Sequence, residues 1–544
     1  MTTNAFHIEF DALRFSYGNE ESSATEPNEP IIALDLRIPR GQCVLVTGPS
    51  GGGKSTLLKL INGLIPHYNG GDLHGTVNIH SRQGTFCPSI QPLWHTGGHV
   101  ANVFQNPNTQ FFTTNVYSEL AFSLENRAVH PAQIRREIEQ GAADLHATHL
   151  LDRSLFALSG GERQAIATTA AFIQRPEIFV FDEPTSSLDA ASIETFRSSL
   201  EKIKQSGATI VIAEHRFYFL EGIIDRAIVI DGSLRADMPA SEFFSMDDDA
   251  RIRFGLRQLR RPTVSTHFPT FPLKVSDTAS DSCPENIANA DVYALSDARM
   301  PSDTGTQNAV ETQREVGARS GVGARSGVSS SDSADGNNTT GLRLHEVRIA
   351  LHNRRKIMKL PNLHFPRGKV SAVGGKNGIG KTTLNRTLVG LHKLRSGKIL
   401  LDGEELTQRS RLARSYFVMQ DVNRQLFSDS VEAELTIGQR STTHCGDNSQ
   451  LDDALDLFNL DAVRHYHPLA LSGGQKQRLV VATATMMDRD IYVFDEPTSG
   501  LDWKHLQSVA TALKKLAQRG KVVILVTHDT ELMNACADLY YELV

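Results

Sequence analysis

The acidic hexapeptide FDEPTS occurs twice in this chain of 544 residues, as Phe181–Ser186 and again as Phe494–Ser499. Two further pairs of motifs accompany it in the same order: GPSGGGKS at 48–55 with GKNGIGKT at 375–382, and LSGGERQ at 158–164 with LSGGQKQ at 471–477. A repeat spaced this widely indicates a duplicated domain, because solenoid repeats are only about 20–50 residues long. The sequence therefore predicts two related halves.

The composition changes between the two halves. Residues 262–340 are rich in Ser, Thr, Asp, Gly and Ala, and they include the tandem VGARSGVGARSGV at 316–328. No apolar period persists there, so we expect a flexible, disordered, low-complexity linker. The whole chain is also too long for one hydrophobic core. We therefore predict a first domain at 1–261 and a second domain at 341–544, joined by this linker.

The overall composition argues against several classes of protein. The formal net charge of −6 disfavours a nucleic-acid-binding protein. The five cysteines form no CxxC pair, which suits a reducing cytosol and gives no zinc or iron–sulfur framework. From the N-terminal residues MTTNAFHIEF we expect no signal peptide, and the apolar runs are far shorter than the ~20 residues that span a bilayer. A role at a membrane would need another chain to provide the span.

Short apolar runs recur in both halves and end in polar turns. They are CVLVTG, IFVFD and TIVIA in the first half, and SAVGG, IYVFD and VVILVT in the second. Runs of this kind between helical stretches predict buried parallel strands and an α/β fold. Because α/β sheets bind ligands at the carboxyl ends of their strands, we expect the motif residues to meet at that edge.

Two glycine-rich loops match the pattern GxxxxGK[ST]. Their glycines let successive backbone N–H groups surround phosphate oxygens, and the following helix adds its positive N-terminal end. Lys54 and Lys381 would reach the β- and γ-phosphates, and Ser55 and Thr382 would bind Mg²⁺. The predicted nucleotide-binding residues of the two loops are Gly48, Pro49, Ser50, Gly51, Gly52, Gly53, Lys54, Ser55 and Thr56, and Gly375, Lys376, Asn377, Gly378, Ile379, Gly380, Lys381, Thr382 and Thr383.

Each hexapeptide places two carboxylates directly after an apolar strand. We expect Asp182 and Asp495 to hold Mg²⁺, mostly through water. Glu183 and Glu496 would polarise the water that attacks the γ-phosphate. A capped turn between a strand and a helix would not require two adjacent acids, so the pattern favours phosphate chemistry.

Together these motifs resemble those of ABC-type ATPases: a Walker A loop, an LSGG signature, a Walker B strand with a following Glu, a D-loop Leu-Asp and a switch His. They occur twice, so the resemblance covers nearly all of both halves. It implies two P-loop nucleotide-binding domains, each with a mostly parallel core sheet and a helical signature subdomain. It also implies ATP and Mg²⁺ as cofactors and ATP hydrolysis as the reaction.

In this family each nucleotide lies between the Walker A loop of one domain and the signature of the other, so the resemblance implies two composite sites formed by one chain. The first would join Lys54, Ser55, Asp182, Glu183 and His215 to Ser472, Gly473 and Gly474. The second would join Lys381, Thr382, Asp495, Glu496 and His528 to Ser159, Gly160 and Gly161. Glu183, Glu496, His215 and His528 are the implied catalytic residues, and Asp189 and Asp502 are the D-loop aspartates.

The resemblance also implies an aromatic residue that stacks on adenine and a glutamine that senses Mg²⁺. Tyr17 takes the aromatic position in the first half, whereas the matching stretch of the second half, VRIALHN, offers only Leu351 or His352. The implied Mg²⁺-sensing glutamines are Gln105 and Gln420. The segments around them, VFQNPNTQFF and VMQDVNRQLF, resemble those of ATPases in energy-coupling-factor importers.

The subfamily resemblance implies the energising subunit of a membrane importer at the cytoplasmic face of a prokaryotic cell membrane. Its expected partners are integral membrane transport subunits: a transmembrane coupling protein and a separate substrate-binding membrane protein. A vitamin, a precursor or a metal ion would be the cargo. The alternative is a soluble tandem ABC ATPase that acts on ribosomes, which the acidic charge and the Gly-, Pro- and Ser-containing linker disfavour.

Two other features have ordinary interpretations. His74, His80, His95, His99 and Cys87 are irregularly spaced, which favours a solvated loop over a metal site. The run LRQLRR at 256–261 fits a solvated helix end better than a phosphate-binding patch.

Overall fold

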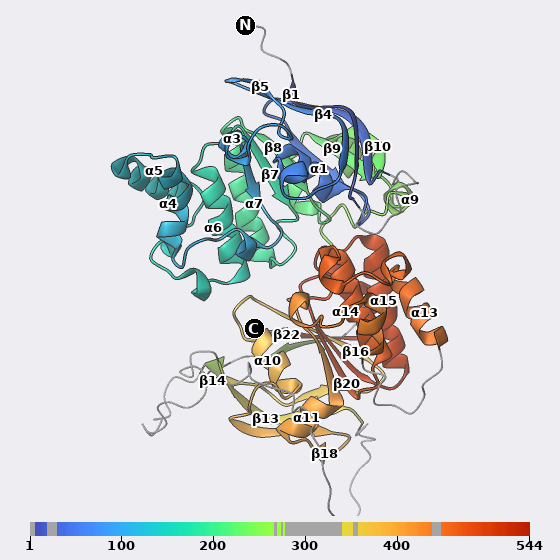
Figure 1. Cartoon of the computed structure of the whole chain (residues 1–544). Helices are drawn as coiled ribbons and strands as arrows, with labels where there is room; N and C mark the ends of the chain where they lie inside the picture. Colours follow the sequence, from blue (N-terminus) through green and yellow to red (C-terminus); the bar gives the residue numbers. More distant parts are fainter. Residues whose placement is uncertain are drawn as a thin grey trace, which may run out of the picture. The chain divides into compact units, whose positions relative to one another are not determined.

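The computed structural model describes residues 6–18, 30–265, 269–273, 276–277, 340–351, 357–437 and 448–544. Figure 1 shows its helices and strands, coloured along the sequence. Contacts join the described residues of both halves into one unit. Most of the predicted linker, residues 278–339, lies outside the described residues, and so does His352.

The first half contains one mixed sheet with the strand order β5-β4-β1-β2-β10-β9-β3-β8-β7-β6. Strands β6, β7, β8, β3 and β9 run parallel to one another, whereas β10 pairs antiparallel with β9, and β1 pairs antiparallel with β2 and β4. The bounds are β1 Phe6–Ser16, β2 Ile32–Pro39, β3 Cys43–Thr47, β4 Asp72–Ser81, β5 Gly84–Phe86, β6 Val100–Val103, β7 Ile178–Asp182, β8 Thr209–Ala213, β9 Arg226–Asp231 and β10 Ser233–Pro239.

The helices of the first half cover this sheet and form a small subdomain beside it (Figure 1). Their bounds are α1 Lys54–Ile61, α2 Leu64–His67, α3 Leu93–His99, α4 Val116–Asn126, α5 Pro131–Asp144, α6 Gly160–Phe172, α7 Ala190–Gln205, α8 Ala240–Phe244 and α9 Asp248–Arg253. Helices α4, α5 and α6 share an apolar core that includes Leu120, Ile138 and Ile166. This is the helical subdomain that carries the first LSGG sequence.

The second half has two sheets. Strands β11-β22-β16-β21-β20-β19 form the parallel one, and β12-β14-β13-β17-β18 form the other, with β15 paired to β13. The bounds are β11 Thr270–Leu273, β12 Ser276–Asp277, β13 Leu342–Ala350, β14 Ile357–Lys359, β15 Leu363–Phe365, β16 Val370–Gly375, β17 Ser396–Leu401, β18 Glu404–Glu405, β19 Ser415–Val418, β20 Ile491–Asp495, β21 Val522–Val526 and β22 Leu539–Leu543.

The helices of the second half are arranged along the chain in a similar order. Their bounds are α10 Lys381–Leu388, α11 Gln408–Arg414, α12 Val431–Thr436, α13 Asn448–Phe458, α14 Gly473–Met486, α15 Trp503–Gln518 and α16 Thr530–Cys536. One large core packs α14 and α15 against β20 and β21. The predicted apolar runs are the buried strands β3, β7, β8, β16, β20 and β21, so the α/β prediction is confirmed in both halves.

The register of the parallel strands brings the motifs together. Asp182 at the end of β7 lies beside Ala213 at the end of β8, and Asp495 lies beside Val526 in the same way. Because parallel strands end at one edge, the acidic pair and the residues around each switch histidine become neighbours there. The glycine-rich loops leave β3 and β16 at the same edge, directly before α1 and α10.

Part of the predicted linker is ordered into strands. Strand β11 pairs parallel with β22, and β12 pairs antiparallel with β14. Phe271 stacks on Tyr541 with 5.2 Å between the ring centroids. The segment that follows the first half thus adds an edge strand to the sheet of the second half, which the composition of residues 262–340 did not indicate.

Candidate nucleotide-binding and hydrolysis sites

The first glycine-rich loop connects β3 to α1. A Cβ atom on Gly48 would lie 2.0 Å from the carbonyl oxygen of Ile230, and the φ of Gly48 is 137°, so only glycine fits there. Lys54 is buried, and its Nζ donates hydrogen bonds to two loop carbonyl oxygens at 2.9 and 3.1 Å. Ser55 Oγ donates to Asp182 Oδ1 at 3.0 Å. The predicted phosphate and Mg²⁺ residues of the first half are therefore adjacent.

The second loop, between β16 and α10, has the same form. Helix α10 begins after Gly380, whose φ is 110°. Lys381 Nζ donates to the carbonyl oxygen of Gly375 at 2.6 Å and lies 2.8 Å from Nε2 of His528. The predicted switch histidine of this half thus touches the predicted phosphate-binding lysine. Gln420 is exposed.

A cavity of about 820 Å³ joins the first loop to the signature of the second half. Its lining includes Ser50, Gly51, Gly53, Lys54, Ser55, Thr56, Gln105 and Glu183 from the first half, and Ser472, Gly473 and Gly474 from the second. Cavities of roughly 300–1,000 Å³ accommodate small organic ligands. The cavity thus brings the first glycine-rich loop, Gln105 and Glu183 to the signature of the second half. Asp182 and His215 of the predicted first site are not among its lining residues.

Each LSGG serine caps the N-terminus of the helix that follows it. Ser159 and Ser472 are the N-caps of α6 and α14, and each forms a capping box, with Glu162 and Gln475 respectively. This interaction fixes the first turn of each helix. In the cavity, the N-terminal end of α14 therefore presents free backbone N–H groups and a partial positive charge, which suits a phosphate.

The two D-loop aspartates reach across to the opposite glycine-rich loop. Asp502 Oδ2 accepts a hydrogen bond from the backbone N–H of Ser50 at 2.6 Å, and Asp189 Oδ2 accepts one from that of Asn377 at 3.2 Å. With its other oxygen, each aspartate caps the helix that follows it, α15 or α7. Both halves therefore contact each other through the same pair of motifs.

At the second predicted composite site, the contact between the halves is this D-loop bond from Asn377 to Asp189. Gly161 of the first signature lies against its own half, because a Cβ atom there would approach Ser192 Oγ to 2.3 Å. A Cβ on Gly160 would also lie nearest to its own half, at 3.9 Å from Ser187, whereas a Cβ on its counterpart Gly473 would lie 3.4 Å from Gln105 Oε1 of the other half. A Cβ on Gly500 would lie 2.5 Å from Glu183 Oε2, so the second D-loop passes directly beside the first acidic pair.

Both predicted catalytic glutamates have left-handed backbone conformations, with φ of 45° at Glu183 and 51° at Glu496. Such strain is uncommon for residues other than glycine and is found frequently at functional sites. Glu183 Oε2 accepts a hydrogen bond from Gln105 Nε2 at 2.8 Å, and its other oxygen lies 3.6 Å from His215 Nε2. Burial, with the neighbouring Asp182 charge, raises the pKa of Glu183 well above its usual value.

Glu496 makes different contacts. It accepts hydrogen bonds from Thr527 Oγ1 and from the backbone N–H of His528, both at 2.9 Å. Burial raises the pKa of Glu496 to about 7. Burial and the Lys381 charge lower the pKa of His528 to about 4. The imidazole of His528 is therefore neutral near pH 7 in this arrangement.

Two tyrosines line the first cavity, one from each half. Tyr17 packs edge-on against Phe15 at 4.9 Å, and its hydroxyl lies 3.3 Å from Thr56 Oγ1. Tyr466, six residues before the signature serine Ser472, was not identified from the sequence. In the second half, Leu351 packs beside Gly380 where the first half has an aromatic residue.

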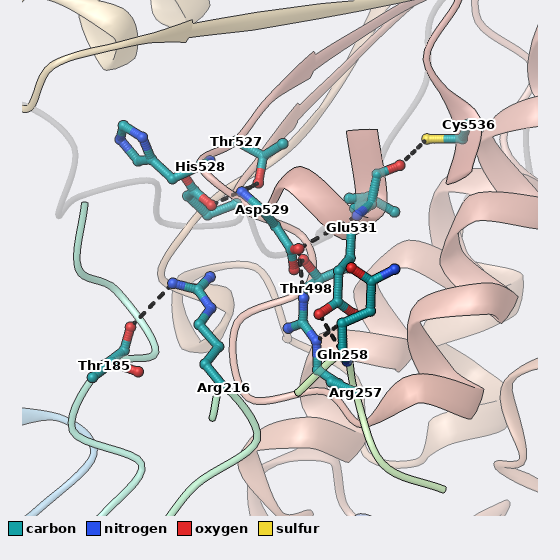
Figure 2. A network of polar contacts seen from close by, with 12 residues as sticks. Thr185, Arg216, Arg257, Gln258, Thr498, Thr527, His528, Asp529, Glu531 and Cys536 are labelled. Carbon is teal, nitrogen blue, oxygen red and sulfur yellow. Dashed lines mark hydrogen bonds and ion pairs between the residues drawn. The ribbon is translucent and has the colours of Figure 1, made fainter. Parts of the chain in front are cut away.

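A buried ion-pair network between the halves corrects one interpretation of the sequence. Arg257, in the run read as a solvated helix end, is 3% exposed and pairs with Asp529 at 2.5 Å and Glu531 at 3.1 Å. The backbone N–H of Gln258 also donates to Glu531. Figure 2 shows this network beside His528. The interpretation failed because the compensating carboxylates belong to the other half of the chain.

The histidine-rich stretch also differs from its interpretation as a solvated loop. His74 and His80 lie on β4, and His95 and His99 lie on α3. His95 and His99 pack against Phe86 with 4.8 and 5.1 Å between ring centroids. Among the residues that the structure describes, no group of three or more His, Cys, Asp or Glu side chains could hold a metal ion.

Comparison with known sequences decides the family. Residues 32–186 and 358–499 match the family described as ABC transporter. A protein of Treponema denticola named "Putative ABC transporter ATP-binding protein" is 36% identical over 96% of this chain and 92% of its own length. The chain belongs to the ABC transporter family. It is an ABC ATPase with two ABC repeats, and it uses ATP with Mg²⁺.

Another relative in this family is named for its cargo. "Putative HMP/thiamine import ATP-binding protein YkoD" of Bacillus subtilis is 28% identical over 97% of this chain and 88% of its own length. A solved structure described as a model of ribosome-bound archaeal Pelota and ABCE1 has a TM-score of 0.56 at 20% identity, covering 93% of this chain and 73% of that one. At this identity, the structural likeness shows the shared fold.

In the described part of the chain, no helix combines the length and the apolar composition that crossing a bilayer requires.

Proposed function

We propose that this ABC ATPase is the energising subunit of a membrane importer of the energy-coupling-factor type. It binds two ATP between its halves and couples their hydrolysis to uptake of a small solute such as a vitamin, a precursor or a metal ion. Its partners are a transmembrane coupling protein and a separate membrane protein that binds the solute. It works at the cytoplasmic face of a prokaryotic cell membrane.

The proposed roles of the site residues follow their chemistry. The glycine-rich loops and the LSGG sequences hold the phosphates, and Tyr17 stacks on the adenine of the first site. Mg²⁺, when bound by Ser55 and Asp182 or by Thr382 and Asp495, neutralises phosphate charge. Gln105 and Gln420 are the proposed Mg²⁺-sensing glutamines. Glu183 and Glu496 orient and polarise water, and His215 and His528 are the switch residues beside them.

A repeated exposed aromatic supports a protein partner at the Q-loops. Phe112 and Phe427 occupy the same place after Gln105 and Gln420, and they are 73% and 77% exposed. Large exposed aromatic side chains commonly mark protein interfaces. Each half carries one such exposed phenylalanine. A partner with two equivalent docking elements could therefore contact both halves in the same way.

The backbone around each phenylalanine is fixed by a buried carboxylate. Glu119 Oε2 accepts hydrogen bonds from the N–H groups of Phe112 and Thr113 at 3.0 and 2.8 Å. Glu434 Oε2 accepts the corresponding bonds from Phe427 and Ser428 at 2.9 and 2.8 Å. A buried acid that orders an exposed aromatic favours a preformed docking surface over an incidental loop.

Two further observations bear on the choice between importer and ribosomal factor. The relative named for HMP/thiamine import shares nearly the full length of this chain and supports the importer. The likeness to ribosome-bound ABCE1 is one of fold, and the net charge of −6 does not favour a surface rich in RNA.

The test is co-purification from membranes of the native host in mild detergent, with the chain tagged. We expect small, very hydrophobic membrane proteins to accompany the wild-type chain. The double variant Phe112→Ala/Phe427→Ala should lose most of them while its basal ATPase activity stays near that of the wild type. Trp94→Ala is the matched control, because Trp94 is also highly exposed but lies on α3. Ribosomal proteins without membrane proteins would overturn the proposal.

A further inference from the structure

The two glutamates proposed as water-polarising bases are held in different ways. Glu183 is bonded to the Q-loop through Gln105 Nε2, and it lines the first cavity. Glu496 is instead bonded to the switch loop of its own half, through Thr527 Oγ1 and the backbone N–H of His528. Both have the same left-handed backbone, so the difference arises in the side chains.

The difference follows the identity of one residue. The position before the switch histidine is Glu214 in the first half and Thr527 in the second. In the first half, Glu214 Oε2 accepts the N–H of His215 at 2.8 Å. In the second half, Glu496 accepts the equivalent N–H of His528 at 2.9 Å. Glu214 thus occupies the hydrogen-bonding position that the base itself takes in the other half.

Glu214 is fixed firmly in this position. It is 2% exposed, and it also accepts hydrogen bonds from the N–H and the hydroxyl of Thr185 and from the N–H of Arg216 at 3.1 Å. A second carboxylate cannot use the same donors, and two close carboxylates in a buried site repel each other. Glu183 is therefore excluded from the switch loop and directed towards Gln105.

In the second half, a different acid accepts the hydroxyl of the threonine in the hexapeptide. Asp529, directly after the switch histidine, accepts the hydroxyl of Thr498 at 2.7 Å, and Thr498 corresponds to Thr185 (Figure 2). In the first half the corresponding position is Arg216, which donates to the carbonyl oxygen of Thr185 at 3.3 Å. Because Asp529 supplies this acid in the second half, the position before the switch histidine is a threonine, and Thr527 donates its hydroxyl to Glu496.

We propose that Glu214 is a positioning residue that keeps Glu183 directed into the first site, whereas Thr527 holds Glu496 at the switch loop. The two hydrolysis sites of this one chain are consequently unequal. The first site has its base directed into the cavity, and the second requires its base to leave Thr527. This inference rests on the proposed roles of Glu183 and Glu496.

The test measures each site in isolation in the full-length chain. Glu496→Gln leaves the first site as the source of turnover, and Glu183→Gln leaves the second; the double variant should bind ATP without turnover. Adding Glu214→Thr to Glu496→Gln should lower kcat about ten- to a hundredfold, the cost of a misplaced reacting group, while KM changes less than about twofold. Adding Thr527→Val to Glu183→Gln should raise kcat several-fold, because the hydroxyl that retains Glu496 is lost.

The results separate positioning from folding. Glu214→Gln keeps the size of the side chain and one acceptor oxygen, so it should fold and lower the first-site kcat less than Glu214→Thr does. An unchanged kcat in both Glu214 variants would overturn the inference, as would equal losses in kcat and in ATP affinity. Vigorous hydrolysis by the double variant Glu183→Gln/Glu496→Gln would instead remove the proposed roles of the two bases.

Discussion

At the scale of single residues, the first cavity has an aromatic ring from each half. Tyr17 and Tyr466 both contribute to its lining, and Leu351 stands where the second half lacks an aromatic residue. Stacking between aromatic side chains and bases contributes roughly 1–3 kcal/mol per base. The two composite sites should therefore differ in their affinity for adenine.

We predict that Tyr466→Ala weakens ATP binding at the first site by about tenfold, close to the loss expected when one stacking face is removed. The measurement is titration with a fluorescent ATP analogue in the Glu183→Gln/Glu496→Gln background, where hydrolysis does not interfere. Tyr466→Phe keeps the ring and is the matched control, so its affinity should stay near that of the wild type. An equal loss in Tyr466→Phe would assign the effect to the hydroxyl.

The residues proposed to hold phosphate and Mg²⁺ in the first half could be expected to lie together because their chemistry fixes both type and spacing. Lys54, Ser55 and Asp182 are adjacent in the structure, as GxxxxGK[ST] and the acidic pair indicate. Tyr466 and Glu214 were missed for a physical reason: their roles depend on contacts that no local motif encodes. Comparing the two switch segments, AEHR and VTHD, was the one sequence signal that could have identified Glu214.

At the scale of elements, an ion-pair network fastens the two sheets of the second half together. Arg367, after β15, pairs with Asp402 and with Asp490, each at 2.8 Å, and Arg414 at the end of α11 also pairs with Asp490 at 2.8 Å. The hydrogen bond from Arg367 lowers the pKa of Asp402 below its usual value. Burial would raise the pKa of Asp490, but its bonds to the two arginines outweigh burial and lower it.

The sign of these shifts sets a pH dependence. Carboxylates whose pKa is lower in the folded state stabilise the fold above about pH 4, and this contribution is lost as the pH falls through the folded values. Arg367→Ala should therefore lower the free energy of unfolding of the second half by about 1 kcal/mol at pH 7, with the difference shrinking below pH 4. Fluorescence of Trp503, in a Trp94→Phe background, follows that half during urea unfolding.

The control for this prediction is Arg424→Ala. Arg424 pairs with Asp421 at 2.9 Å in the same half, but both side chains are largely exposed, so its removal should change the free energy of unfolding little at either pH. A deficit in Arg367→Ala that persists unchanged at pH 3 would contradict the assignment to Asp402 and Asp490.

Elements of the core could be predicted better than those at the edges. The buried runs IFVFD and IYVFD are apolar at successive positions because both faces of β7 and β20 are covered. Strand β11 has no such run, since its place depends on the edge offered by β22. The histidines on β4 and α3 were misread because their alternating polar neighbours resemble those of a loop.

At the scale of the whole molecule, the buried triad of Arg257, Asp529 and Glu531 joins the two halves. Charged residues are rarely buried without partners, so the run LRQLRR gave no reason to expect this. Removing one member of a buried ion pair costs roughly 3–5 kcal/mol, because the remaining charge is left without compensation.

We predict that Arg257→Ala lowers the free energy of unfolding by about 3 kcal/mol, which chemical denaturation of the full chain can measure. The double variant Arg257→Ala/Glu531→Gln should be less destabilised than Arg257→Ala alone, since it leaves one buried negative charge in place of two. Additive losses in the double variant would show that Glu531 and Arg257 stabilise the protein independently of each other.

The added strand β11 has a mechanical consequence. Its backbone is bonded to β22, which pairs in turn with β16, and β16 leads directly into the second glycine-rich loop at Gly375. A pull on the residues that precede β11 would therefore reach the second glycine-rich loop through two strand pairings, β11 with β22 and β22 with β16. Because β12 is also paired within the second half, this pull would not depend on the length of residues 278–339.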